Sequence, residues 1–554
     1  MATSERITGG QALVRALVAQ GVTTLFALPG VQLDFVFDAL YDVRDRLKVV
    51  HVRHEQATAY MADGYARTTG QPGVCLMVPG PGLLNASAGL ATAYACSSPV
   101  VCLTGQVDSH AINAGYGLLH EVRDQDRILA SLTKWSGRAA APFQIPGLVE
   151  RAFAEASSGR PRPVALELPP DVLQRAQDNV HAASRATIPR QHADPDLLRK
   201  AAELLRQSER PVIYSGGGTL TAAAWSELRE VAEMLEAPVV MSVDGRGALS
   251  DRDDLAHTGV TGQALVQEAD VVLGVGTRFW QPSRVWGLAA GARVIRIDAD
   301  PAELSRHGQP EIAICADARL ALSALRDHLD GLPKKRESRR EELRARKSAA
   351  DEHLSTFQPQ ADFTAAMRRA LPDDGITVND LTQVTFYATV GLPIYAPRTF
   401  IGPGYQGTLG SAFATALGAQ AGNPDRAVVA LAGDGGFLYA LAELATQRQH
   451  ELNVVSIVFN DNAFGNVKRT QELAFGGRML GSELVNPDFV AVGKAFGIDA
   501  ERVDTGPRLE AALRSALAAR RPALIEVSTG PMSNVWPVIG PAGGIYPIVV
   551  EPLK

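Results

Sequence analysis

Residues 428–471 read VVALAGDGGFLYALAELATQRQHELNVVSIVFNDNAFGNVKRTQ, in which two apolar runs each end in a polar turn. The first run, 428–432, leads into Gly-Asp-Gly-Gly, leucines at helical spacing follow, and the second run, 454–459, ends in Asn-Asp-Asn. This order predicts a strand, a turn, a helix and a second strand, joined by a right-handed crossover. The two strands would end side by side at the carboxyl edge of a parallel sheet, where such folds bind ligands.

Two carboxylates stand at these strand ends. Asp434 and Asp461 have the hard oxygen ligands that Mg²⁺ prefers. Gly435 and Gly436 allow the backbone to approach an anion closely, and the helix that they open offers free N–H groups. Together they predict a diphosphate bridged to the protein by Mg²⁺. The glycine turn alone also fits an ordinary surface turn, because Gly-Asp-Gly is common in turns, but the acidic end of the next strand favours a ligand site.

The composition indicates a globular protein of several domains. The chain has 554 residues, of which 46% are hydrophobic and 21% are charged, and this length exceeds what one core holds. A net charge of −6 gives no electrostatic case for a nucleic acid or a membrane as partner. The apolar runs are too short to span a membrane, and MATSERITGG lacks the apolar core of a signal peptide. Four cysteines without CxxC spacing predict buried free thiols in a reducing compartment, so we expect the cytoplasm.

Strands that alternate with helices predict three doubly wound, parallel α/β domains, over residues 1–175, 193–332 and 355–554. A polar stretch, 174–194, and a charged run, 333–352, are the expected linkers, and the second should form a solvated helix. The expected helices near the N-terminus cover 7–21 and 56–69. The expected strands of the first two domains cover 23–27, 49–52, 74–78, 100–104 and 164–168, then 211–214, 239–242, 271–275 and 294–297. Gly216-Gly217-Gly218 is not GxGxxG, so a plain strand-to-helix turn is favoured there over a nucleotide site.

Over its whole length the chain resembles the superfamily of thiamine-diphosphate-dependent decarboxylases and acetolactate synthases. The stretch that opens this section is similar to the family signature, Gly-Asp-Gly followed by an Asn-Asn pair, with Asp461 in place of the second Asn. Local matches in the order found in acetolactate synthases are FALPG (26–30), RHEQ (53–56), GYAR (64–67), PGPG (79–82), LTGQV (103–107) and GTLG (407–410). The resemblance implies a first domain that binds the pyrimidine ring of the cofactor and a third domain that binds its diphosphate.

The resemblance also implies roles for individual residues. Glu55 would hydrogen-bond the aminopyrimidine ring and favour the imino tautomer that takes the proton from the thiazolium C2; without the RHEQ match it would be a helix-dipole glutamate. Leu409 would hold the cofactor bent, or else be an ordinary core leucine. The implied Mg²⁺ ligands are Asp434, Asp461 and the carbonyl of Ala463. The implied cofactor-binding residues are Pro29, Glu55, Asn85, Thr382, Gln383, Gly407, Leu409, Gly433, Gly435, Gly436, Asn466 and Val467. The implied catalytic residues are Glu55, Gln106 and His120.

The implied reaction is decarboxylation of a pyruvate-like 2-oxo acid and ligation of the resulting carbanion to a carbonyl acceptor, in a homodimer or homotetramer with each site between two subunits. A non-ligating decarboxylase, a hydroxy ketone lyase or carboligase, and a catalytically silent regulatory homologue stay open. A nicotinamide oxidoreductase is disfavoured, because no GxGxxG opens a βαβ unit.

Three departures from the synthases concern the substrate and the cofactors. His120 stands in Leu-His-Glu where synthases carry Phe-Gln-Glu, so it is predicted to be an acid/base residue that faces the substrate. The alternative is a loop histidine bonded to Glu121 or Asp124. The stretch 259–262, Gly-Val-Thr-Gly, lacks the Met-His-Gly flavin contact of the synthases and argues against bound FAD. Thr470 stands near the place of a Trp that in synthases favours 2-oxobutyrate as the acceptor.

Overall fold

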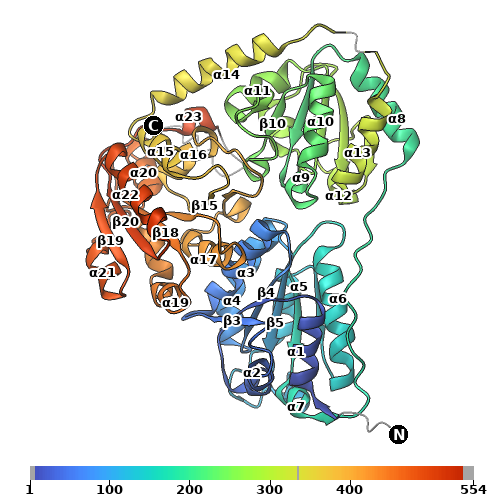
Figure 1. The fold of residues 1–554 in the computed structure, drawn as a ribbon, viewed down its shortest axis with the longest axis vertical. Helices are drawn as coiled ribbons and strands as arrows, with labels where there is room; N and C mark the ends of the chain where they lie inside the picture. Colours follow the sequence, from blue (N-terminus) through green and yellow to red (C-terminus); the bar gives the residue numbers. More distant parts are fainter. Residues whose placement is uncertain (1–5, 334–335, 541–554) are drawn as a thin grey trace.

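Each of three α/β domains is built on one six-stranded sheet in the computed structural model, which describes residues 6–333 and 336–540. In Figure 1 the first domain, blue to cyan, lies below the central domain, green, and the third domain, orange to red. Neighbouring strands within these sheets are parallel. The predicted fold class is therefore confirmed.

The first and third sheets have the same topology. Counted in chain order, the strands of each sheet lie side by side as 2-1-3-4-6-5. The first sheet runs β3 (Lys48–His51), β2 (Thr24–Ala27), β4 (Gly73–Met77), β5 (Val100–Gly105), β7 (Val164–Leu168) and β6 (Trp135–Arg138). The third runs β16 (Phe400–Ile401), β15 (Ile376–Asn379), β17 (Val428–Gly433), β18 (Val454–Asn460), β20 (Ala523–Ser528) and β19 (Asp499–Val503). The chain changes direction across each sheet between its first and third strands, and such a switch point is where open α/β sheets bind ligands.

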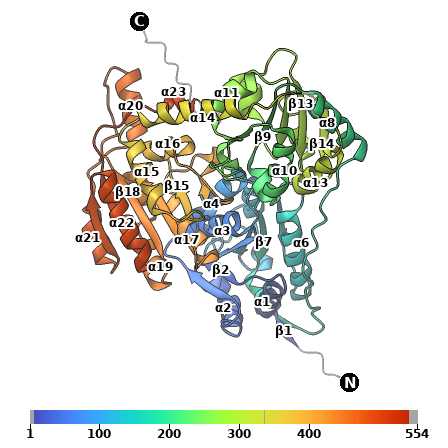
Figure 2. The same cartoon turned by 45° about the horizontal axis from the view of Figure 1, so that its top comes forward.

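Helices cover both faces of these two sheets (Figures 1 and 2). Those of the first domain are α1 (Gly9–Ala19), α2 (Asp34–Tyr41), α3 (Glu55–Thr69), α4 (Pro81–Ala95), α5 (Gln125–Leu132), α6 (Ile145–Ser157) and α7 (Pro170–Gln174). Those of the third domain are α15 (Gln360–Ala370), α16 (Gln383–Gly391), α17 (Ala412–Gly422), α18 (Asp434–Phe437), α19 (Glu443–Gln449), α20 (Gly465–Ala474), α21 (Phe489–Ala495), α22 (Gly506–Ala519) and α23 (Trp536–Ile539).

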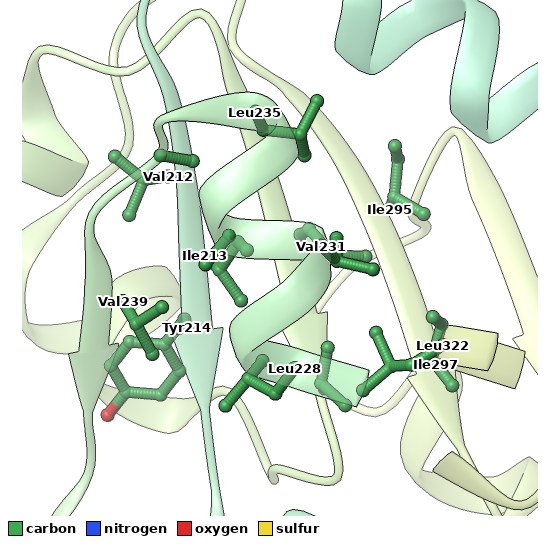
Figure 3. Close-up of a cluster of buried hydrophobic side chains, with 14 of the residues drawn as sticks. Val212, Ile213, Tyr214, Leu228, Val231, Leu235, Val239, Ile295, Ile297 and Leu322 are labelled. Atoms are coloured by element: carbon green, nitrogen blue, oxygen red, sulfur yellow. The ribbon is translucent and has the colours of Figure 1, made fainter. Parts of the chain in front are cut away.

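The central domain has the strand order 3-2-1-4-5-6. Its strands are β11 (Ala256–His257), β10 (Val239–Met241), β9 (Pro211–Ser215), β12 (Val271–Val275), β13 (Arg293–Asp298) and β14 (Ile312–Cys315). Its helices are α8 (Pro195–Gln207), α9 (Gly217–Thr221), α10 (Trp225–Leu235), α11 (Gly259–Gln267), α12 (Pro301–Leu304) and α13 (Ala318–Leu329). Figure 3 shows Leu228, Val231 and Leu235 of α10 gathered against the sheet, and all three are fully buried. This helical spacing is what an apolar stripe facing a core requires.

Helices α3 and α17 join the first and third domains. A Cβ at Gly64 would lie 2.0 Å from the carbonyl oxygen of Thr415, and one at Gly418 would lie 1.9 Å from that of Met61. Glycine is therefore required on both helices for their backbones to approach this closely. Buried side chains of the two domains form one continuous cluster around this crossing. The crossing fixes how the carboxyl edge of the first sheet lies relative to the third domain.

Helix α14 (Arg340–Ser355) forms most of the second predicted linker, 333–352, and runs along the central domain toward the third (Figure 1). It is mostly exposed, as its charge pattern predicts, and Arg346 and Arg344 form ion pairs with Glu268 and Asp254 of the central domain, at 2.8 and 2.6 Å. Over the described ranges, no helix combines the length and the apolar character that a membrane span requires.

Local structure departs from the sequence-based expectations in several places. The first helix begins at Gly9, because Ile7 and Thr8 pair with 176–177 at the start of the predicted linker and Thr8 caps the helix. The helix expected after Gly436 is broken into α18, a 3-10 turn (Leu438–Ala440) and α19. The short strands β6, β11, β14, β16 and β19 were not predicted, because 2–5 residues carry little periodicity. Cys96 and Cys315 are only partly buried, unlike Cys75 and Cys102. The end of the third predicted domain, 541–554, lies outside the described residues.

Candidate active site

The switch point of the third sheet, between β15 and β17, opens into a cavity of about 1770 Å³. The residues after β15 and after β17 line it, as does the segment after β18. The sequence-predicted residues that line the cavity are Thr382, Gln383, Gly407, Leu409, Gly433, Asp434, Gly435, Gly436, Asp461, Ala463, Asn466 and Val467. All site residues predicted in the third domain thus face one space.

Asp434 and Asp461 lie together, as the βαβ argument predicts. The backbone N–H of Ala463 donates to both, at 3.2 Å from Oδ2 of Asp434 and 3.2 Å from Oδ1 of Asp461. Burial, and then the charge of Asp434, raise the pKa of Asp461 to about 6. Burial also raises the pKa of Asp434, against hydrogen bonds from Gly435 and Asn486. Two crowded carboxylates favour a bound cation, which would lower both pKa values.

Asn486 is a site residue that the sequence-based prediction missed. Its Nδ2 donates to Oδ2 of Asp434 at 2.7 Å and to Oδ1 of Asn460 at 3.1 Å, and its Oδ1 is buried without a protein partner. Asn460 in turn donates to Glu526. A single asparagine in a loop carries no sequence signal, so only the folded chain reveals this support for the first carboxylate.

Asp380, also missed, supports the loop that carries Leu409. Both carboxylate oxygens of Asp380 accept the N–H of Gly410, at 3.0 and 2.9 Å, and burial raises the pKa of Asp380 to about 7. A Cβ at Gly436 would lie 2.7 Å from Asp380 Oδ2 and 3.3 Å from Leu409 Cδ1. Gly407 and Gly410 have φ of +61° and +81°, which favour glycine. The GTLG loop is thus held against the glycine-rich turn.

The start of α16 presents polar groups without partners to the same cavity. Thr382 caps the helix through the N–H of Thr385. Gln383 accepts a hydrogen bond from Arg469 through Oε1, but its Nε2 is buried without a partner. Asn379 Oδ1 is likewise buried without one. Because buried polar groups are normally satisfied, these atoms are suited to a polar ligand.

The predicted residues of the first domain lie at the carboxyl edge of their own sheet, outside the lining of this cavity. Glu55 is the first residue of α3 and accepts a hydrogen bond from Nδ2 of Asn85 at 2.9 Å. Pro29 follows β2, next to the switch point of the first sheet. The structure thus brings Glu55 and Asn85 together, but it does not join them to Asp434 in the cavity of one chain.

Gln106 and His120 have different surroundings. Gln106 is buried, donates to Glu167 at 2.9 Å and accepts the N–H of Val107 at 2.7 Å, so both ends of its amide are used within the fold. His120 is half-buried, and its Nδ1 lies 3.0 Å from Oε1 of Gln32. The carboxylate of Glu121 instead accepts N–H groups of its own loop, so His120 has the loop position but not the partner of the alternative interpretation.

Comparison with known families decides the identity. Family models for three domains of thiamine pyrophosphate enzymes match the chain in order. The N-terminal TPP binding domain matches 7–128, the central domain matches 198–325, and the C-terminal TPP binding domain matches 380–527. The chain belongs to the thiamine pyrophosphate enzyme family. The predicted family is confirmed, and the protein is an acetolactate synthase-like enzyme of this family that depends on thiamine pyrophosphate (thiamine diphosphate).

Curated relatives in the thiamine pyrophosphate enzyme family align with almost the whole chain. A probable acetolactate synthase large subunit of Methanocaldococcus jannaschii is 33% identical over 98% of this chain and 96% of its own length. The large subunit of acetolactate synthase isozyme 3 of Escherichia coli is 33% identical over 98% of both chains. A probable 2-ketoarginine decarboxylase of Pseudomonas aeruginosa is 35% identical over 95% of both.

The cavity fits the cofactor of the thiamine pyrophosphate enzymes. A Cβ added at Gly435 would lie 2.5 Å from Cε1 of Phe464, so the glycine-rich turn has no room for a side chain at this position. The unpartnered Nε2 of Gln383 and the crowded carboxylates supply, respectively, a donor for a diphosphate and ligands for a metal ion. The described residues contain no group of three His, Cys, Asp or Glu side chains suited to a metal, so such an ion would depend on these two carboxylates and on backbone oxygen.

The cavity also extends beyond the residues that are predicted to bind the cofactor. It continues over the carboxyl end of β9 and is lined there by Gly216, Gly217 and Gly218. These glycines form the strand-to-helix turn that the sequence predicts, and they lie at the switch point of the central sheet. Gly259, in the stretch that departs from the flavin contact of the synthases, begins α11.

Proposed function

We propose that this thiamine pyrophosphate enzyme uses Mg²⁺, decarboxylates a pyruvate-like 2-oxo acid and joins the remaining acyl fragment to a carbonyl acceptor. One carbon–carbon bond breaks to release CO₂, one forms to the acceptor carbon, and the acceptor oxygen takes up a proton. The observation that carries the proposal is the paired carboxylates, Asp434 and Asp461, in the cavity at the switch point of the third sheet. The relatives named acetolactate synthase support it.

Different residues of this cavity would hold the metal ion, the diphosphate and the rings of the cofactor. Asp434, Asp461 and the carbonyl of Ala463 would hold Mg²⁺, which the diphosphate would share. Thr382, Gln383 and the glycines 433–436 would hold the diphosphate itself. When bound, the cofactor supplies the nucleophilic carbon and the electron sink for decarboxylation. Gly407 and Leu409, held by Asp380, would orient the rings.

Glu55 would hold and move the proton that activates the cofactor. Its Oε2 already accepts a hydrogen bond from Asn85, which fixes the direction of the carboxylate. The position of a Cβ on Gly82 lies 3.6 Å from Glu55 Oε1, an ordinary contact distance, so Gly82 lies directly beside the carboxylate. We place neither Gln106 nor FAD in the proposal: the Gln106 amide is engaged with Glu167, and 259–262 lacks the flavin contact of the synthases.

A complete site would need two copies of the chain, in a homodimer or a homotetramer. Glu55 does not line the cavity that Asp434 lines, so we propose that a second copy supplies it. Both edges present exposed apolar side chains that suit an interface: Leu119 is 62% exposed in the first domain, and Leu480 and Val485 are 86% and 102% exposed in the third. We also propose that the chain folds as three domains, over 1–175, 193–332 and 355–554, and that the protein acts in the cytoplasm.

A decarboxylase that does not ligate is the second candidate, and His120 favours it. A histidine beside the reacting centre can deliver a proton where a glutamine can only hydrogen-bond. Protonation of the acyl fragment would release an aldehyde instead of a ligated product. The relative named as a probable 2-ketoarginine decarboxylase agrees with this second candidate.

A substrate screen tests the proposal. The protein, loaded with thiamine diphosphate and Mg²⁺, is incubated with a series of 2-oxo acids, with and without aldehyde or 2-oxo acid acceptors, while CO₂ and ligated product are followed. CO₂ with ligated product is expected. CO₂ with aldehyde alone would select the second candidate, and no turnover of any donor would support a silent homologue.

A further inference from the structure

The turn before Glu55 is held by a segment of the third domain. The N–H groups of Arg53 and His54 both donate to Oε1 of Glu443, at 3.1 and 2.9 Å. Glu443 is the first residue of α19, which follows α18 and the glycine-rich turn at Asp434. The two residues directly before Glu55 are therefore anchored to a single carboxylate on another domain.

Further contacts surround this anchor. Gln56 Nε2 donates to the carbonyl of Tyr439 at 2.8 Å, and the N–H of His51 donates to Nε2 of His450 at 3.2 Å. The Arg53 guanidinium donates to Oε1 of Gln449 at 2.6 Å. Residues 51–56 of the first domain thus form several hydrogen bonds with the segment 439–450 of the third domain. The bond to Tyr439 lies at the break between α18 and α19.

Glu443 is an unusual residue to bury. It is 1% exposed, its hydrogen-bond partners are backbone N–H groups and the hydroxyl of Thr446, and burial raises its pKa. A buried carboxylate whose hydrogen bonds come from neutral groups costs free energy unless those bonds are strong. A charged acceptor binds two N–H groups better than a neutral amide does, because an amide offers one oxygen and turns its NH₂ toward the remaining donors.

We propose that Glu443 is a positioning residue for Glu55. Its carboxylate fixes the backbone at Arg53 and His54. The side chain of His54 then accepts the N–H of Gln56 and caps α3, so the orientation of the first turn of α3 is fixed. Because Glu55 is the first residue of α3, the orientation of this turn decides where its carboxylate points. The inference rests on the proposed function, in which Glu55 is the group that activates the cofactor. In the two-chain arrangement, Glu443 would act on the site that its own Asp434 does not serve.

Two variants and a matched control test this role. Glu443→Gln keeps the size and removes the charge, and Thr446→Val removes one hydrogen bond to the carboxylate with less risk to folding. Gln449→Ala removes a contact between the same two segments without touching Glu443. Each protein is measured in three ways: amide hydrogen exchange of residues 51–56 without cofactor, affinity for thiamine diphosphate with Mg²⁺, and the rate of C2–H/D exchange of bound thiamine diphosphate.

In Glu443→Gln we expect faster amide exchange over 51–56, cofactor affinity within about twofold of wild type, and C2 exchange slower by roughly ten- to a hundredfold, because small misplacements of a catalytic group have effects of this size. Thr446→Val should change the same quantities less, and Gln449→Ala should change none. Unaltered C2 exchange in both Glu443→Gln and Thr446→Val would overturn the proposal, as would a loss that only follows weakened cofactor binding. A wild-type protein that leaves the C2 proton at its solution rate would instead overturn the proposed function, and amide exchange would still decide whether Glu443 orders the turn.

Discussion

Nδ1 of His120 lies 3.0 Å from Oε1 of Gln32, and Nε2 of Gln32 lies 3.1 Å from the carbonyl oxygen of Leu119. A carbonyl only accepts, so the amide nitrogen of Gln32 must face Leu119 and its oxygen must face the imidazole. Nδ1 of His120 therefore carries a hydrogen. This leaves Nε2 as the atom that can exchange a proton. The backbone of His120, with φ of +68°, further restricts where the ring can lie.

Replacing His120 by Gln should shift the products toward ligation. A glutamine cannot protonate the acyl fragment, so the ratio of aldehyde to ligated product should fall. Gln32→Leu should lower the same ratio less, because it keeps the histidine and removes only its hydrogen-bond partner. Product analysis checks both variants. An unchanged ratio in His120→Gln would leave His120 as loop structure only.

Glu55→Gln should retain the cofactor and lose most of the rate. The amide is similar in size and can keep a contact with Asn85, but it cannot exchange the required proton. We expect C2–H/D exchange of bound thiamine diphosphate to slow by about 100-fold or more, within the usual range for a lost acid–base group. Calorimetric titration with cofactor is the control. Exchange at the wild-type rate would remove Glu55 from the mechanism.

Mixed dimers should recover activity from two inactive variants. If each site takes Glu55 from one chain and Asp434 from the other, a hybrid of Glu55→Gln and Asp434→Ala chains keeps one intact site of two. Random mixing would then give about a quarter of wild-type activity, since half the dimers are hybrids with one working site. Differently tagged chains allow the hybrid to be purified and assayed. Silent hybrids, or full activity in a proven monomer, would refute a site shared between chains.

Asn486→Ala should weaken Mg²⁺ binding without removing a ligand. Asn486 donates to Oδ2 of Asp434 at 2.7 Å, and groups that orient metal ligands typically account for about 10–100-fold in affinity. Asp461→Asn is the comparison, because it keeps an oxygen at the ligand position and removes only a charge. Titration of the cofactor-loaded protein with Mg²⁺ separates the two. Wild-type affinity in Asn486→Ala would show that Asp434 needs no such support.

The sequence predicted the parts of the site that follow from strand ends. β17 and β18 pair in parallel with Gly433 opposite Phe459, so Asp434 and Asp461 had to meet. Asn486, Asp380 and Gln32 could not be predicted in this way, since each reaches the site from a loop, a strand end or a short 3-10 helix whose position only tertiary packing sets. The break before Glu443 was missed for a related reason: it lies in a segment, 439–450, that contacts another domain, and such tertiary contacts do not show in a helical pattern.

Gly418→Ala should destabilise the protein through the crossing of α3 and α17. The added Cβ would lie 1.9 Å from the carbonyl oxygen of Met61, which is backbone within a helix and cannot move alone, so the two helices must separate. Overpacking of this kind costs about 1–3 kcal/mol or more, even though alanine is the better helix former. Gly147→Ala is the matched control, because Gly147 lies in α6 with no atom within 4 Å of its added Cβ. Urea denaturation should show a lower midpoint for Gly418→Ala and an equal or slightly higher one for Gly147→Ala. Equal midpoints for both variants would mean that the crossing can widen at no cost, and that the close approach of the first and third domains does not depend on glycine.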